Sequence, residues 1–304
     1  MGITKIILLA TLVSVLAASA ADAETLAELK AKVDKFAESF RGTLGYSLHF
    51  KGAPDQSISR LPDEPFPTAS TIKTAIMCEV LHQVEQGKIK WTDKIEVQPS
   101  DDRQEGGFAC YFKEGTKLSV AKWVHLMITV SDNTATMLLR EHIGQKNVND
   151  WLAANGFKTT RLLNGKKCDE LGLRQLQREY GLGMTTPAEM MRLHEMIHDG
   201  KAGSPASCDR MVRILAHQYW DDNIGSQAPP MRSASKSGFI GGNHSDVAFV
   251  SSPKGDYVLA IYIKDCKDTQ EGDSALRTLA AMVWRHFDPD DTWAPPDGAA
   301  KLLP

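Results

Sequence analysis

FPTASTIKTAIMCEVLHQV, residues 66–84, places Ser70 and Lys73 one helical turn apart within a run of mostly apolar residues. Apolar side chains recur at every fourth position, which predicts one face of a helix: Ile72, Ile76, Val80 and Val84. The nearest acid along this helix, Glu79, is six residues from Lys73 and not on its face. We therefore expect Lys73 either to be buried with a partner from elsewhere or to have a lowered pKa. Under either condition, a lysine can take a proton from a hydroxyl group.

A second motif lies at a break between two predicted helical runs. LMITVSDNTATMLL, residues 126–139, contains Ser131, Asp132 and Asn133 in succession. The hydroxyl of Ser131 can relay a proton to a leaving nitrogen, and Asn133 offers both a donor and an acceptor to an amide of a substrate.

A third motif lies on a predicted strand near the C-terminal end. SASKSGF, residues 233–239, contains Lys236, Ser237 and Gly238. Lys236 supplies positive charge and Ser237 a hydroxyl at a place where a substrate carboxylate can bind. Acyl transfer needs an activated nucleophile, and a serine is weak until a neighbouring group takes its proton. The three motifs together supply these parts.

The order S-x-x-K, S-D-N and K-[T/S]-G is typical of class A β-lactamases and penicillin-binding proteins, and the mature chain resembles a class A β-lactamase over its whole length. The resemblance implies a serine hydrolase, without a cofactor, that opens the β-lactam ring through an acyl-enzyme on Ser70. It further implies that Asp132 orders its own loop. By the same resemblance, the backbone amides of Ser70 and Phe239 bind the oxyanion.

The resemblance also implies a loop glutamate that holds the water for hydrolysis of the acyl-serine, within the pattern E-x-x-L-N. Counting back from the TTP sequence at 185–187, Glu170 takes the glutamate position and Leu173 the leucine position. Arg174 stands where the family has asparagine. We expect Arg174 to pair with Glu170, to lower the pKa of that carboxyl and to slow deacylation. Glu179 is the alternative base.

The rest of the pattern predicts sheet elements at both ends of the chain and helices between them. Amphipathic helices are expected over 24–40 and about 274–287, next to short alternating runs that indicate strands. We predict an α/β fold of the α+β type. An antiparallel sheet from both chain ends (about 24–68 and 217–290), flanked by the terminal helices, lies beside an all-helical lobe (about 69–216). The active site is expected in the cleft between them.

The first 23 residues predict a secretory signal peptide. Lys5 precedes an apolar run that extends to about Ala21, and an A-x-A sequence ends at Ala23, so cleavage is expected before Glu24. The apolar run is shorter than the ~20 residues of a spanning helix. We therefore expect a catalytic domain over 24–304 that is periplasmic or secreted, without stable membrane insertion. An uncleaved membrane anchor is the alternative.

Composition narrows the choice of partners. The 304-residue chain has a formal net charge of -3 and shows no basic stripe, which argues against nucleic-acid binding. Its five cysteines are widely spaced and allow at most two disulfides, with one thiol left over. We expect a monomer that acts on a small β-lactam.

Three other functions compete with this interpretation. A D-Ala-D-Ala peptidase or penicillin-binding protein would use the same acylation residues without efficient attack by water. HEMIH at 194–198 matches the H-E-x-x-H pattern of zinc metalloproteases, with His194 and His198 as ligands, although no clear third ligand follows. A catalytically idle binding module with the same fold is the third alternative. The sequence-based prediction includes no metal.

Overall fold

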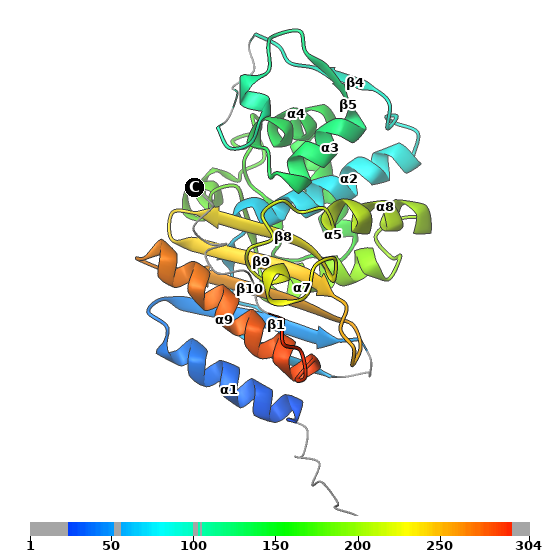
Figure 1. The fold of residues 1–304 in the computed structure, drawn as a ribbon. Coiled ribbons are helices and arrows are strands. Elements are labelled where there is room, and N and C mark those ends of the chain that lie inside the picture. The colour runs from blue at the N-terminus through cyan, green and yellow to red at the C-terminus, as the bar shows by residue number, and fades with distance from the viewer. Residues whose placement is uncertain (1–23, 52–55, 100–102, 104, 294–304) are drawn as a thin grey trace, which may run out of the picture.

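The computed structural model describes residues 24–51, 56–99, 103 and 105–293. The predicted signal peptide lies outside the described residues. Figure 1 shows a central antiparallel sheet with one long helix from each end of the chain on the same face. Most of the other helices gather at the opposite end of the molecule.

The central sheet has the strand order β2–β1–β10–β9–β8, and all neighbouring strands are antiparallel. The strands are β1 (Thr43–Phe50), β2 (Ser57–Arg60), β8 (Ser233–Ile240), β9 (Asn243–Val250) and β10 (Tyr257–Lys264). Two strands come from the N-terminal part of the chain and three from the C-terminal part. The predicted sheet made from both ends is therefore confirmed.

Strand β10 separates two hydrophobic cores, because alternate side chains of a strand point to opposite faces of the sheet. Leu259 and Ile261 pack into the core under the terminal helices, whereas Ala260 and Tyr262 pack into the core shared with the helical part. Helix α7 (Pro187–His198) contacts β1, β9 and β10 from this second side. Both faces of the sheet are therefore covered.

The terminal helices α1 (Leu26–Ser39) and α9 (Thr269–Phe287) pack together on the first face. Thr25 and Glu28 form a capping box at the start of α1. Helix α9 begins earlier than predicted, because the Asp268 carboxylate accepts hydrogen bonds from the amides of Gln270 and Glu271 at its N-terminus.

The middle of the chain forms most of the remaining helices. They are α2 (Lys73–Glu85), α3 (Val120–Thr129), α4 (Asn133–Ile143), α5 (Gln145–Ala154), α6 (Arg174–Tyr180), α7 and α8 (Pro205–Leu215), with short 3₁₀ turns η1 (Ala69–Ile72), η2 (Ala109–Tyr111) and η3 (Gly225–Gln227). Helix α2 runs through the centre of this part, and ten of its residues are buried.

The prediction of an all-helical lobe was wrong in detail. Two small sheets interrupt the helices, one with the order β3–β7–β6 and one made of β4 and β5. Their strands are β3 (Phe66–Pro67), β4 (Lys94–Glu96), β5 (Lys117–Ser119), β6 (Arg161–Leu162) and β7 (Gly183–Thr185). Strands of two or three residues are too short to give an alternating pattern in the sequence.

All five cysteines are free thiols, and four of them are buried. The two disulfides that the cysteine count allows are therefore not formed. No helix within the described part of the chain is long and apolar enough to cross a membrane.

Candidate active site

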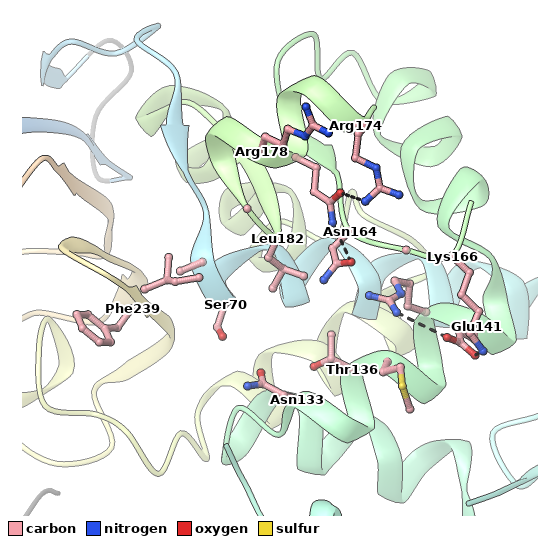
Figure 2. A pocket seen from close by; sticks show the side chains of 17 residues that line it. Ser70, Asn133, Thr136, Glu141, Asn164, Lys166, Arg174, Arg178, Leu182 and Phe239 are labelled. Atoms are coloured by element: carbon pink, nitrogen blue, oxygen red, sulfur yellow. Dashed lines mark hydrogen bonds and ion pairs between the residues drawn. The ribbon is translucent and has the colours of Figure 1, made fainter. Parts of the chain in front are cut away.

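Ser70 lies in the 3₁₀ turn η1, immediately before helix α2 rather than inside it. Ala69 precedes it with a φ of 43°, in the left-handed region. The turn is fixed from the sheet side, since the Thr71 hydroxyl shares a 2.8 Å hydrogen bond with that of Tyr262 on β10. Ser70 is partly exposed and lines a cleft of about 840 Å³. Figure 2 shows its side chain facing this cleft.

Lys73 is the first residue of α2 and is fully buried. Its Nζ lies 2.5 Å from the backbone oxygen of Ser131, 3.1 Å from the Ser131 hydroxyl and 2.8 Å from Oδ1 of Asn133. Burial, and next the charge of Lys236, hold the pKa of Lys73 well below its usual value, while Asp132 opposes the shift. Lys73 is therefore both buried against partners from another part of the chain and lowered in pKa, the two conditions that the sequence predicts as alternatives.

The S-D-N motif forms the turn between α3 and α4. Ser131 has a φ of 58°. The buried Asp132 carboxylate caps α4 through the amide of Ala135 and also accepts hydrogen bonds from the amides of Phe108 and Ala109, each 2.7 Å long. Asp132 thus orders its own loop and the loop before it, which agrees with the prediction. Ser131 and Asn133 are held against the amine of Lys73 as a result.

Lys236 lies on β8 and is also fully buried. Its Nζ donates a 2.9 Å hydrogen bond to the backbone oxygen of Ser237. Burial lowers the pKa of Lys236 to about 8, and Asp246 on β9 opposes this shift. Because Lys236 also contributes to the lowered pKa of Lys73, the two amines belong to one electrostatic unit.

Gly238 lets strand β8 approach the nucleophile. A Cβ atom at this position would lie 2.7 Å from the amide nitrogen of Ser70 and 2.8 Å from the backbone oxygen of Thr68. Only a glycine permits this approach. The next residue, Phe239, is 55% exposed and lines the cleft. The structure thus brings the three motifs together around Ser70.

The loop between β6 and β7 forms another wall of the cleft, and it differs from the prediction. Arg174 does not pair with Glu170. It forms a bidentate ion pair with Asp169 and donates a 2.6 Å hydrogen bond to Gln177. The guanidinium holds the pKa of Asp169 below its usual value. A neighbouring carboxylate in the sequence therefore takes the position that we had expected for Glu170.

The structure does not bring the two predicted bases to Ser70. Glu170 lies in an exposed turn and Glu179 is exposed on α6, and neither is among the residues that line the cleft. The role of Glu170 in deacylation stays a prediction.

A carboxylate that the sequence analysis missed does line the cleft. Glu141 on α4 lies 2.7 Å from Nζ of Lys166 and 3.7 Å from a guanidinium nitrogen of Arg140. Helical spacing from Asn133 was the available signal, since residues seven and eight positions further along lie on the same face. The position of Lys166 depends on the fold of the loop and gave no such signal.

The H-E-x-x-H segment on α7 serves structural contacts. His194 is buried beside the hydroxyl of Thr74, and burial lowers its pKa to about 3. Glu195 contacts His49 and Lys51, whereas the ring of His198 stacks on Phe249. Across the described residues, no three His, Cys, Asp or Glu side chains are grouped so that they could hold a metal ion.

Comparisons with known proteins agree with this geometry. A model described as the Beta-lactamase enzyme family matches residues 28–287. Beta-lactamase VEB-1 from Pseudomonas aeruginosa is 23% identical over 274 residues, which cover 85% of this chain and 90% of that protein.

Solved structures are similar over most of their length. A beta-lactamase from Sphaerobacter thermophilus has a TM-score of 0.75 at 26% identity, and covers 85% of this chain and 95% of its own. An ancestral class A β-lactamase has a TM-score of 0.74 at 27% identity, and the match covers 84% of this chain and 98% of that one. A point mutant of PBP-A, solved as an acyl-enzyme complex with penicillin G, has a TM-score of 0.76 at 25% identity. The match covers 88% of this chain and 98% of that one. The chain is therefore an enzyme of the beta-lactamase family, with the fold of the class A enzymes.

Proposed function

We propose that Ser70 is the nucleophile that opens the β-lactam ring. Lys73 takes the proton from the Ser70 hydroxyl as the oxygen bonds to the carbonyl carbon, and Ser131 passes a proton to the ring nitrogen as the C–N bond breaks. One observation carries this proposal: the buried amine of Lys73 contacts the hydroxyl of Ser131 at 3.1 Å, one turn from Ser70. This contact supports the second half of the proposed proton path, from Lys73 through Ser131 to the leaving nitrogen.

The remaining motif residues bind the substrate in this proposal. Lys236 and Ser237 bind the substrate carboxylate, and Asn133 binds the amide on the acyl side. The backbone amides of Ser70 and Phe239 form the oxyanion hole, which the close approach of Gly238 to the Ser70 amide supports.

Hydrolysis of the acyl-enzyme is proposed to be the slow step, because Glu170, the base that the sequence predicts, does not line the cleft. A general base must reach the water from which it takes the proton. Glu170 is exposed outside the cleft, and Glu141 inside the cleft is neutralised by Lys166. This observation keeps open a second candidate function, a penicillin-binding peptidase with slow deacylation. The similarity to PBP-A, whose mutant was solved as an acyl-enzyme, supports it.

The rate of hydrolysis of a chromogenic cephalosporin tests the proposal, with the Ser70→Ala variant as the control. We expect turnover by the natural chain and none by the variant. Equal rates would show that the reaction does not use Ser70.

We also propose that the chain is exported after cleavage before Glu24 and acts as a monomer. N-terminal sequencing of protein from the cell envelope or medium checks the cleavage, and light scattering checks the monomer. An N-terminus other than Glu24, or a dimer mass, would contradict these two proposals.

A further inference from the structure

The cleft continues past Ser70 and Asn133 into a region with excess positive charge. Four cationic side chains line it, and Glu141 is the one carboxylate among its lining residues. The four are Arg140 on α4, Lys166 on the loop, and Arg174 and Arg178 on α6. Figure 2 shows Lys166, Arg174 and Arg178 on the side of the cleft away from Phe239. We call this set the cationic wall.

Arg140 is the most buried member of the cationic wall. Its side chain is only 10% exposed. Its Nε is buried and has no hydrogen-bond partner among the described residues. A buried guanidinium with an unused donor is costly unless an anion or another acceptor reaches it.

The acids near the wall do not neutralise it. Glu141 is shared between Lys166 and Arg140, at 2.7 Å and 3.7 Å. Asp169 is taken by Arg174 and is itself exposed, with no place among the residues that line the cleft. Arg178 is exposed and forms no ion pair with the described part of the chain. Positive charge therefore remains in the cleft for a ligand.

We propose that the cationic wall binds a carboxylate carried on the acyl side of the substrate. This inference rests on the proposed function, in which Asn133 holds the amide on that side. Arg140 lies seven residues along α4 from Asn133, which is about 10 Å at 1.5 Å per residue. A substituent that extends from the amide along α4 reaches the wall when it has several carbon atoms and an anionic end.

A matched pair of penicillins tests this proposal. The penicillin nucleus is acylated with adipic acid in one compound and with hexanoic acid in the other, so that a carboxylate replaces a methyl group at the same chain length. Second-order rate constants for acylation of Ser70 are measured for both at low ionic strength. The readout is the ratio of the adipoyl to the hexanoyl rate constant, in which general effects on acylation cancel.

The ratio is expected to exceed one in the natural chain. Arg178→Gln lowers it about three- to tenfold, as the loss of one partly screened charge predicts, and Arg178→Glu brings it below one. Arg140→Lys, which keeps the charge and removes the buried Nε donor, also lowers it. The control Arg213→Gln, on the surface of α8 beside Asp209, leaves it unchanged.

Three outcomes would overturn the proposal: a natural ratio at or below one, a ratio unaffected by both Arg178 variants, or an equal decrease with Arg213→Gln. If Arg140→Lys does not fold, the Arg178 variants still decide the question. Failure of the proposed function gives a different result, since neither penicillin would then acylate Ser70.

Discussion

The two walls of the cleft differ in how firmly the chain holds their polar groups. On the acylation side, Lys73, Asp132 and Lys236 are fully buried, and each has a short hydrogen bond. Lys73 donates to the backbone oxygen of Ser131, Asp132 accepts from the amide of Ala109, and Lys236 donates to the backbone oxygen of Ser237. On the loop side, Glu170 and Glu179 are exposed, and both lie outside the cleft.

This difference separates the two halves of the reaction. Buried polar groups are stable only with their partners in place, so the acylation side has little freedom to vary. The loop side can change its charges without a comparable cost, because water solvates them. We infer that acylation is built into the core of this fold, whereas deacylation depends on the loop.

Replacing the nucleophile should give the largest effect. Ser70→Ala removes the only hydroxyl proposed to attack, so we expect complete loss of covalent labelling by a β-lactam. Intact-protein mass spectrometry measures this directly. Covalent labelling of the Ser70→Ala variant would mean that another residue is the nucleophile and that the wall around Ser70 is not the acylation side.

The second largest effect is expected from removing the charge of Lys236 on the acylation side. Lys236→Ala should lower kcat/KM by about ten- to a thousandfold, equivalent to about 1.4 to 4 kcal/mol, because the substrate carboxylate loses its charged partner. Steady-state or acylation kinetics give the number. An unchanged value for substrates that carry a carboxylate would remove Lys236 from the binding role.

The pH dependence should follow the lowered pKa of Lys236. The amine is charged below about pH 8 and neutral above it, so kcat/KM should fall as the pH rises through 8. Well above pH 8, the decrease approaches about tenfold per pH unit. Lys236→Arg keeps its charge and should move this limb to higher pH. If the fall of kcat/KM occurs at the same pH in Lys236→Arg, it reports the titration of another group.

On the loop side, the exposed glutamate should matter much less. We expect Glu170→Gln to change the deacylation rate by less than about threefold, because its carboxylate lies outside the cleft and general-base catalysis requires contact with the water. Glu179→Gln is the matched control. A permanently trapped acyl-enzyme on Glu170→Gln alone would instead establish Glu170 as the base, and the loop would have to close over Ser70.

The smallest effect is expected from the ion pair of the loop. Arg174→Gln removes the contact with Asp169. Because both side chains are exposed and water screens their charges, the denaturant midpoint of unfolding should stay close to that of the natural chain. Chemical denaturation measures the change. A marked decrease of the midpoint would mean that this pair fixes the conformation of the loop.

Much of the fold and the acylation side could be predicted because local patterns carry the information. The period of four residues around Ser70 identified α2, and the amphipathic pattern over 24–40 identified α1. The start of α9 was missed because the cap at Asp268 gives a weaker signal than the apolar pattern that follows it.

The loop side could not be predicted in the same way. Arg174 was expected to pair with Glu170, but which of two acids it meets depends on the turn conformation rather than on spacing. The partners Glu141 and Lys166 lie 25 positions apart and meet only in the folded chain. Such contacts leave no period in the sequence.

Mass spectrometry of the intact protein over time, after addition of benzylpenicillin, tests the central claim most directly. Opening the ring by addition loses no atoms, so the acyl-enzyme gains the full mass of the penicillin. The account predicts that this adduct forms rapidly and then persists while free penicillin is hydrolysed slowly. Rapid consumption of the penicillin without any adduct on the protein would contradict it.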